Sequence, residues 1–198
     1  NSPRADTTVE KLARLKPVFD RERGVITAGN ASRFTDGAGA LLLGALGQVQ
    51  AHGLQPLAIV RDYLLAGVGR LETEMLLGPA LTIPKILARN GLQFDDIGVW
   101  EIHEAFATQV LINRQCMTSR EFINQRFGAE FPCGEIPMDR LNNWGGSLAL
   151  GNPFAATGVR LLHTAAQRLQ VENQRYAIVA TCAGGGLGAA LLLENPAI

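Results

Sequence analysis

The chain has 198 residues, of which 47% are hydrophobic and 18% charged, a balance typical of a globular protein rather than a disordered one. Basic and acidic residues number 18 each, so the formal net charge is zero and no basic excess indicates nucleic-acid binding. The longest apolar stretch, residues 38–46, is interrupted by glycine and is far too short to span a membrane.

Cysteine usage indicates the compartment. Cys116, Cys133 and Cys182 are too few and too scattered to predict a disulfide framework or a zinc site. We therefore expect a reducing compartment, the cytoplasm. The chain starts without methionine or a signal-peptide pattern, as expected of a piece of a longer protein or of one chain of a split protein.

The first quarter of the chain is predicted to hold little regular structure. Residues 1–24 are polar and contain proline, as expected of a linker or of the tail of a longer segment. Within them, Thr7 is predicted to cap a short amphipathic helix, because a glutamate follows three residues later. Residues 25–27 are predicted to form a strand. Residues 36–52 are predicted to form a helix that is buried, because Ala, Gly and Leu occur on all its sides.

In the remainder of the chain, predicted strands alternate with predicted helices. The predicted strands cover residues 57–60, 99–102, 176–181 and 187–194. The predicted helices cover residues 83–89, 104–116 and 153–169. This alternation predicts a layered α/β protein. Only a few residues join the last two strands, so they are predicted to be antiparallel and the sheet to be mixed.

A cysteine lies at the end of a predicted strand, directly before a glycine cluster. Cys182 is followed closely by Gly184, Gly185 and Gly186. Backbone N–H groups in such a turn are free to face a ligand, where they could lower the pKa of the thiol and bind an oxyanion. The alternative is an inert, buried cysteine before a tight hairpin. A dinucleotide-binding loop fits poorly, because the third glycine falls in the wrong place.

A histidine ends another predicted strand. His103 lies just before a predicted helix, a position suited to acid–base or hydrogen-bonding work. An inert histidine, hydrogen-bonded or paired with Glu104 in the interior, is equally compatible with the sequence.

Two further segments are rich in small residues. Residues 143–158 carry glycines that allow close backbone packing or the close approach of a ligand. Within them, Asn152 followed by Pro153 is predicted to be the N-cap and the first residue of a helix, which leaves the preceding glycines unexplained. Residues 29–37, which include Ser32, indicate a polar turn and a helix cap on composition alone.

These segments, in this order and spacing, resemble the thiolase family over nearly the whole chain. The matching blocks are residues 27–38, 103–106, 145–158 and 182–186. Most thiolases have asparagine at the position of His103. The histidine form, together with residues 142–158, is similar to the β-subunit of the trifunctional complex of fatty-acid β-oxidation and to its bacterial counterpart.

The resemblance implies the thiolase fold, an α/β architecture with a mixed sheet covered by helices. Residues 1–24 would be the tail of a linker or loop region. Residues 25–54 would end the N-terminal domain, and residues 55–198 would form the C-terminal domain. It also implies coenzyme A as a substrate, no permanently bound cofactor or metal, and a homo-oligomer.

The resemblance also implies roles for individual residues. Cys182 would exchange a proton with the α-carbon of the substrate or with the leaving CoA thiol. The backbone N–H of Gly184 would help to form an oxyanion hole, and His103 would polarise the thioester oxygen. Ser32 matches a position that contacts the pantetheine arm of CoA, and Phe106 one that lines the acyl pocket.

Two departures from the family pattern bear on function. Neither Cys116 nor Cys133 lies in the context of the acyl-accepting cysteine, so we expect this chain to carry half of an active site. The histidine of the third block is replaced by Asn152, whose amide donates a hydrogen bond but accepts no proton as a base.

The resulting prediction is the C-terminal half of a 3-ketoacyl-CoA thiolase, inactive by itself and completed by a thiolase N-terminal half. The alternative is a non-catalytic acyl-CoA-binding or assembly subunit that keeps the fold.

Overall fold

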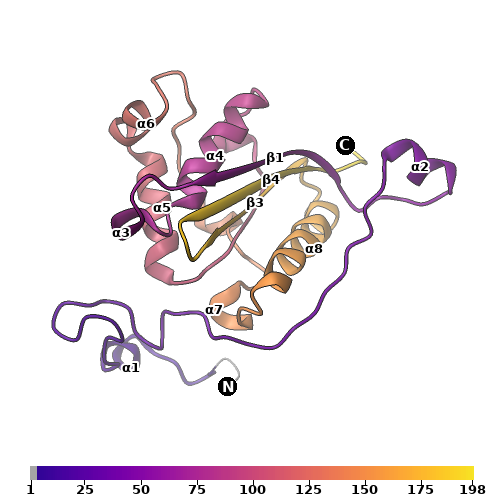
Figure 1. Cartoon of the computed structure of the whole chain (residues 1–198). Coiled ribbons are helices and arrows are strands. Elements are labelled where there is room, and N and C mark those ends of the chain that lie inside the picture. Colours follow the sequence, from indigo (N-terminus) through magenta and orange to yellow (C-terminus); the bar gives the residue numbers. More distant parts are fainter. Residues whose placement is uncertain (1–3) are drawn as a thin grey trace.

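A computed structural model describes residues 4–198 (Figure 1). Within them one mixed sheet has the strand order β1-β4-β3-β2. Its strands are β1 Ile59–Gly67, β2 Val99–Ile102, β3 Tyr176–Ala183 and β4 Leu187–Glu194. Strand β3 pairs antiparallel with β4 and parallel with β2, and β1 pairs antiparallel with β4. The predicted mixed sheet and the predicted antiparallel pairing of the last two strands are confirmed.

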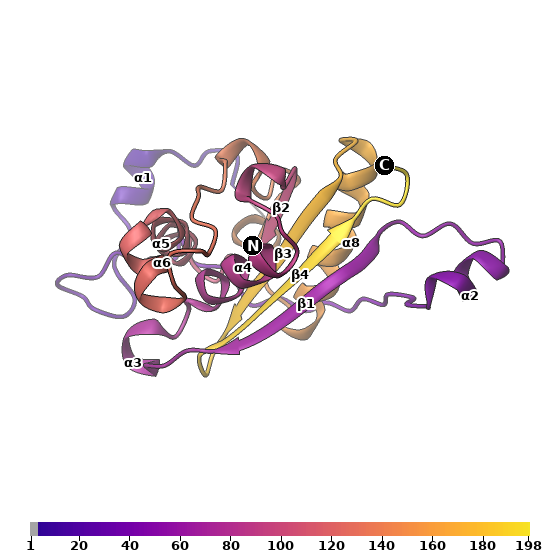
Figure 2. The same ribbon diagram turned by 90° about the horizontal axis from the view of Figure 1, so that it is seen from above.

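Helices cover both faces of this sheet (Figures 1 and 2). The helices of the described chain are α1 Val9–Ala13, α2 Leu46–Ala51, α3 Leu71–Glu74, α4 Gly78–Arg89, α5 Ala107–Thr118, α6 Arg120–Arg126, α7 Ser147–Leu150 and α8 Ala155–Val171, with 3-10 turns at Phe94–Asp96 and Met138–Arg140. Helix α4 packs on one face, with α5 and α6 beyond it, and α8 packs on the other. No helix within residues 4–198 is long and apolar enough to cross a membrane.

Two apolar clusters hold these layers together, because alternate side chains of β3 point to opposite faces. Ile178 and Ala180 pack with α4, whereas Ala177 and Val179 pack with the inner stripe of α8. That stripe repeats at helical spacing, for example at Leu161 and Ala165. The carboxyl ends of β2 and β3 are thereby fixed between α4 and α8, where the candidate residues lie.

Several predicted boundaries change for identifiable reasons. Helix α4 begins earlier than predicted, because Pro79 stands in its first turn, where a missing N–H costs nothing. Helix α5 begins at Ala107 rather than at residue 104, because Phe106 is extended and forms a bridge with Ala31, with hydrogen bonds to that segment on either side.

The N-terminal segment also differs from prediction. The cap of α1 is Thr8, whose hydroxyl accepts a hydrogen bond from Lys11 N at 3.2 Å, and not Thr7. Residues 25–27 form no strand; Thr27 makes only an isolated bridge with Pro17.

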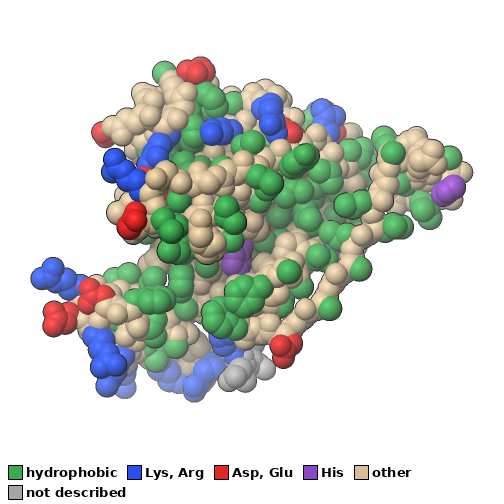
Figure 3. Space-filling view, in the orientation of Figure 1, with side chains coloured by type: hydrophobic (Ala, Val, Ile, Leu, Met, Phe, Trp, Pro, Cys, Tyr) green, Lys and Arg blue, Asp and Glu red, His purple; other side chains and the backbone are tan. Residues whose placement is uncertain are grey.

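The helix predicted over residues 36–52 is largely absent. Residues 37–45 are extended, and only α2 is helical. Leu42 and Leu43 are 91% and 76% exposed, and Figure 3 shows hydrophobic side chains along this arm, which ends in the projecting α2. A helix that is apolar on all sides gains most of its stability from burial, and no described part of the chain covers this one.

Candidate functional site

The cysteine and the glycines lie at the hairpin between β3 and β4. Cys182 is opposite Gly188 in the register and is only 5% exposed. Gly185 and Gly186 have φ of 88° and 75°, values that favour glycine and allow the tight turn. A Cβ on Gly188 would overlap the backbone of Gly78, so this glycine lets the start of α4 pack directly against the hairpin.

The environment of the thiol fits the buried cysteine before a tight hairpin and not the thiol with a lowered pKa. Burial raises the pKa of Cys182 to about 12, although its own backbone hydrogen bond acts in the other direction. Gly184 and Gly185 are exposed, whereas the cysteine side chain is not. The desolvation of the thiolate therefore outweighs the turn's backbone donors, and the proton stays on sulfur at neutral pH.

A groove of about 500 Å³ runs along the end of the hairpin and β1. Its lining includes Thr181, Ala183 and Ala189 from the hairpin and Leu65 from β1. Cys182 is not part of the lining, because successive side chains of a strand point to opposite faces.

His103 directly follows β2 and continues its pairing, since its N–H donates to Ala180 O at 2.8 Å. The ring is 6% exposed, and its Nδ1 lies 2.9 Å from the hydroxyl oxygen of Ser147. That oxygen also accepts from Arg160 Nη2 at 2.7 Å. Burial, followed by the charge of Arg160, lowers the pKa of His103 to about 4.

Glu104 is not paired with His103, so the buried His103–Glu104 pair that the sequence allowed is not formed. Its carboxylate accepts hydrogen bonds from Leu148 N at 2.9 Å and from Asn142 Nδ2 at 2.6 Å. A Cβ on Gly146 would overlap this carboxylate, so the glycine is needed for Glu104 to reach α7. The glycine density before residue 152 therefore serves this close approach.

Asn152 is buried between α7 and α8, but it is not the N-cap of α8, which begins at Ala155. Phe154 has φ of 48°, which interrupts the helical conformation before that point. The Asn152 Oδ1 accepts hydrogen bonds from Phe154 N at 3.1 Å and from Thr157 Oγ1 at 2.7 Å. With both bonds on the oxygen, the amide nitrogen is left to donate.

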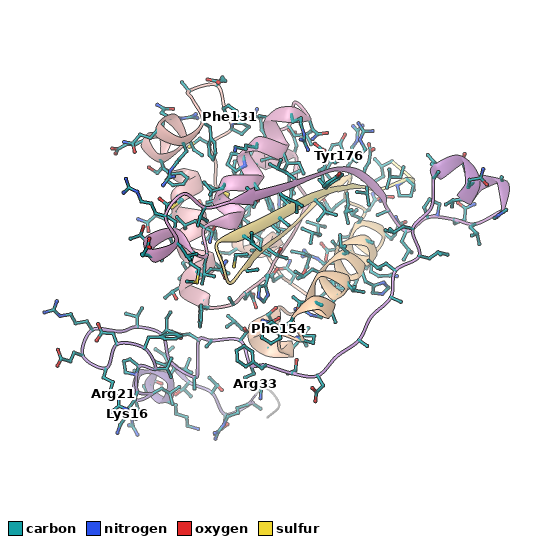
Figure 4. All side chains as sticks on the ribbon, in the orientation of Figure 1. Lys16, Arg21, Arg33, Phe131, Phe154 and Tyr176 are labelled. Atoms are coloured by element: carbon teal, nitrogen blue, oxygen red, sulfur yellow. The ribbon has the colours of Figure 1, made fainter. Side chains whose placement is uncertain are left out.

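The segment that contains Ser32 lies against the other candidates. Ser32 N donates to Ala105 O at 2.9 Å, and the neighbouring residue forms a bridge with Phe106. The O of Arg33 then accepts from Asn152 N at 2.8 Å. Figure 4 shows Arg33 on the extended segment that passes Phe154 and α7. Four segments that are distant in the sequence thus meet where β2 and β3 end.

Comparison with known families accounts for this arrangement. The model of the "Thiolase, C-terminal domain" matches residues 54–195, and that of the "Thiolase, N-terminal domain" matches residues 1–45. This chain belongs to the thiolase family. Its sheet, with helices on both faces, is the corresponding part of the thiolase fold.

Curated relatives are similar over nearly all of this chain. A probable 3-ketoacyl-CoA thiolase of Caenorhabditis elegans is 47% identical over 95% of the chain and 42% of its own length. The human mitochondrial trifunctional enzyme subunit beta is 43% identical over 95% of the chain and 40% of its own length. The chain therefore spans less than half the length of these relatives.

Solved thiolase structures match equally widely. Human mitochondrial 3-ketoacyl-CoA thiolase in complex with CoA has a TM-score of 0.81 and 31% identity, over 98% of this chain and 44% of that one. The dimeric peroxisomal thiolase of Saccharomyces cerevisiae has a TM-score of 0.79 and 34% identity, also over 98% and 44%.

Two polar residues of the candidate site were assigned no role from the sequence. Ser147 is fully buried beside His103, and Arg160 reaches it from α8. Ser147 stands in a block that carries the family resemblance, but nothing in the pattern indicates its partner. Arg168 shows a clearer signal, because it interrupts the apolar stripe of α8. It forms a fully buried ion pair with Glu101 at 2.7 Å.

Proposed function

We propose that this chain is the C-terminal part of a 3-ketoacyl-CoA thiolase of fatty-acid β-oxidation, an enzyme that transfers acyl groups to coenzyme A. The observation that carries the proposal is the meeting of four separate segments at the carboxyl ends of β2 and β3. Ser32 N bonds to Ala105 O, Asn152 N bonds to Arg33 O, and His103 N bonds to Ala180 O. The relative that is named a probable 3-ketoacyl-CoA thiolase supports the same activity.

In this proposal Cys182 acts as a proton donor. A thiol whose pKa is raised to about 12 holds its proton at neutral pH, as required of a group that returns a proton to the substrate carbon or to the leaving CoA thiol. His103 and the Gly184 N–H would donate hydrogen bonds to thioester oxygens. Ser32 would contact the pantetheine arm of CoA, and Phe106 would line the acyl pocket.

The acyl-accepting cysteine would come from a thiolase N-terminal half, on the same gene product or on a separate chain. Residues 1–45, which match part of the N-terminal domain, support such a partner. Cys116 is a poor candidate for the nucleophile, because it packs against the main core and burial raises its pKa. A homo-oligomer and a cytoplasmic location stay predictions.

The alternative function is a non-catalytic acyl-CoA-binding or assembly subunit. Asn152 favours it, because this amide accepts no proton and its oxygen is already bonded to Phe154 N and Thr157 Oγ1. Such a subunit would bind the thioester without cleaving it.

One experiment separates the two functions. The chain is assayed for thiolysis of acetoacetyl-CoA alone and after co-expression with a thiolase N-terminal half, and CoA binding is measured by calorimetry on both samples. Turnover that requires both halves and is lost in Cys182→Ala supports the enzyme. Binding without turnover in the assembly supports the subunit, and the absence of both excludes the thiolase proposal.

A further inference from the structure

The hydroxyl of Ser147 connects two candidate groups of the site. Ser147 is the first residue of α7 and is fully buried. Its oxygen lies 2.9 Å from His103 Nδ1 and 2.7 Å from Arg160 Nη2. Among residues 4–198 these are the side-chain hydrogen bonds that this oxygen makes.

The chemistry of the three groups decides where the protons lie. A guanidinium only donates, so Ser147 Oγ must accept from Arg160. The hydroxyl has a single hydrogen, and within the described chain its one acceptor in reach is the Nδ1 of His103. A proton on Nδ1 would leave that hydrogen buried without an acceptor, which is unfavourable in a site that excludes water.

We propose that Ser147, held by Arg160, fixes His103 in the neutral tautomer that carries its proton on Nε2. His103 is then a hydrogen-bond donor with an occupied acceptor nitrogen. Ser147 and Arg160 are positioning residues, because they act through the imidazole. The role of the Nε2–H toward a thioester oxygen rests on the proposed function, whereas the tautomer does not.

The charge of Arg160 acts in the same direction. A cation bonded to the same hydroxyl disfavours a second proton on the ring, and burial lowers the pKa of His103 to about 4. The ring is therefore neutral at pH 7, and the tautomer determines which of its nitrogens donates a hydrogen bond and which accepts one.

In this tautomer His103 cannot act as the base that a thiolase needs. The Nδ1 of His103 accepts from Ser147, and Nε2 already carries a proton, so neither nitrogen is free to take one from a thiol. His103 therefore does not replace the base that is missing at Asn152. It is suited to polarising a thioester oxygen, as a fixed donor in an oxyanion hole does.

Nitrogen-15 spectroscopy of the isolated chain tests the tautomer directly. The chain is labelled with ¹⁵N-histidine, and long-range proton–nitrogen spectra are recorded at pH 7. His103→Asn assigns the signals, and the exposed His52 and His163 serve as internal references. We expect a protonated Nε2 and an unprotonated Nδ1 for His103, against averaged nitrogens for the references. A protonated Nδ1 would overturn the proposal.

The role of Ser147 is tested by substitution. Ser147→Ala should shift the two His103 nitrogens toward the averaged positions of the references. Ser119→Ala is the matched control, since Ser119 also lies at the start of a helix but its hydroxyl accepts from Phe122 N. If Ser147→Ala does not fold, Ser147→Cys keeps the volume with a weaker donor and should show the same shift. An unchanged His103 spectrum in the folded variant would exclude Ser147 as the positioning residue.

A kinetic measurement on the assembled enzyme separates this inference from the proposed function. Ser147→Ala should lower kcat by up to about 10²–10³-fold, the loss that follows removal of one oxyanion-hole donor, and should change KM less. An inactive wild-type assembly would count against the proposed function while the spectra still decide the tautomer. An active assembly in which Ser147→Ala changes neither constant would overturn the functional part.

Discussion

Removing the buried imidazole should change how stability depends on pH. We predict the effect for His103→Asn, which replaces a titrating ring by an amide of smaller size. The pKa of His103 lies near 4 in the folded chain, against an ordinary value of 6.5. Between these values the unfolded chain binds the proton more readily, so the wild type loses stability as the pH falls.

The magnitude follows from the same two values. One pKa unit corresponds to about 1.4 kcal/mol, so a fall from 6.5 to about 4 is worth at most about 3 kcal/mol between pH 7 and pH 4. Glu101 acts oppositely, because burial raises its pKa to about 7 against the opposing hydrogen bond and charge of Arg168. Its contribution is present at low pH and is lost as the pH rises toward 7.

The two groups act in opposite directions in the wild type, so the difference between variants is needed to isolate the contribution of His103. Unfolding by urea is measured from pH 4 to pH 8 for the wild type, His103→Asn and the exposed control His163→Asn. On acidification, the free energy of unfolding of the wild type should fall relative to that of His103→Asn, by at most about 3 kcal/mol. The free energy of unfolding of the wild type should not change relative to that of the control His163→Asn. A constant difference between the wild type and His103→Asn would refute the reasoning.

Three further predictions concern the site and the N-terminal arm. In an assembly with a thiolase N-terminal half, Asn152→His should raise kcat by about 10²–10⁴-fold, because an imidazole takes the proton that an amide cannot. Steady-state kinetics of both forms checks this, and KM should change less than kcat. In the folded chain Cys182 should be alkylated last by iodoacetamide, after the half-buried Cys133, because Cys182 is buried and protonated; timed mass spectrometry gives the order. Residues 36–52 should become helical when the N-terminal half covers their apolar side chains, which circular dichroism of the assembly against its separate parts would show as a gain in helix.

Elements that are buried in this chain could be predicted from its sequence. Residues 99–102 and 187–194 are apolar runs between turns, and both form strands over the predicted bounds. The helix predicted over residues 36–52 does not form as predicted, because its apolar pattern is typical of a buried helix. No other described segment buries its side chains.

The site was predictable by residue type but not by environment. Its candidates stand at strand ends and glycine turns, which the local pattern shows. Their partners come from distant positions: Ser147 lies 44 residues after His103, and no spacing rule connects them. The pKa of Cys182 was misjudged because sequence neighbours reveal backbone donors, whereas desolvation depends on how closely α4 packs against the hairpin.

Burial therefore makes the groups of this half-site donors rather than acceptors of protons. It keeps the proton on Cys182, it keeps His103 neutral, and Ser147 occupies the one nitrogen that could accept. Asn152 commits its oxygen to its own turn and leaves its N–H groups to donate. A set of donors can bind and polarise a thioester, but it cannot generate a thiolate. Catalysis by the proposed enzyme therefore requires that the other half bring a nucleophile that ionises without help from residue 152, and kinetics of the assembly measures that requirement directly.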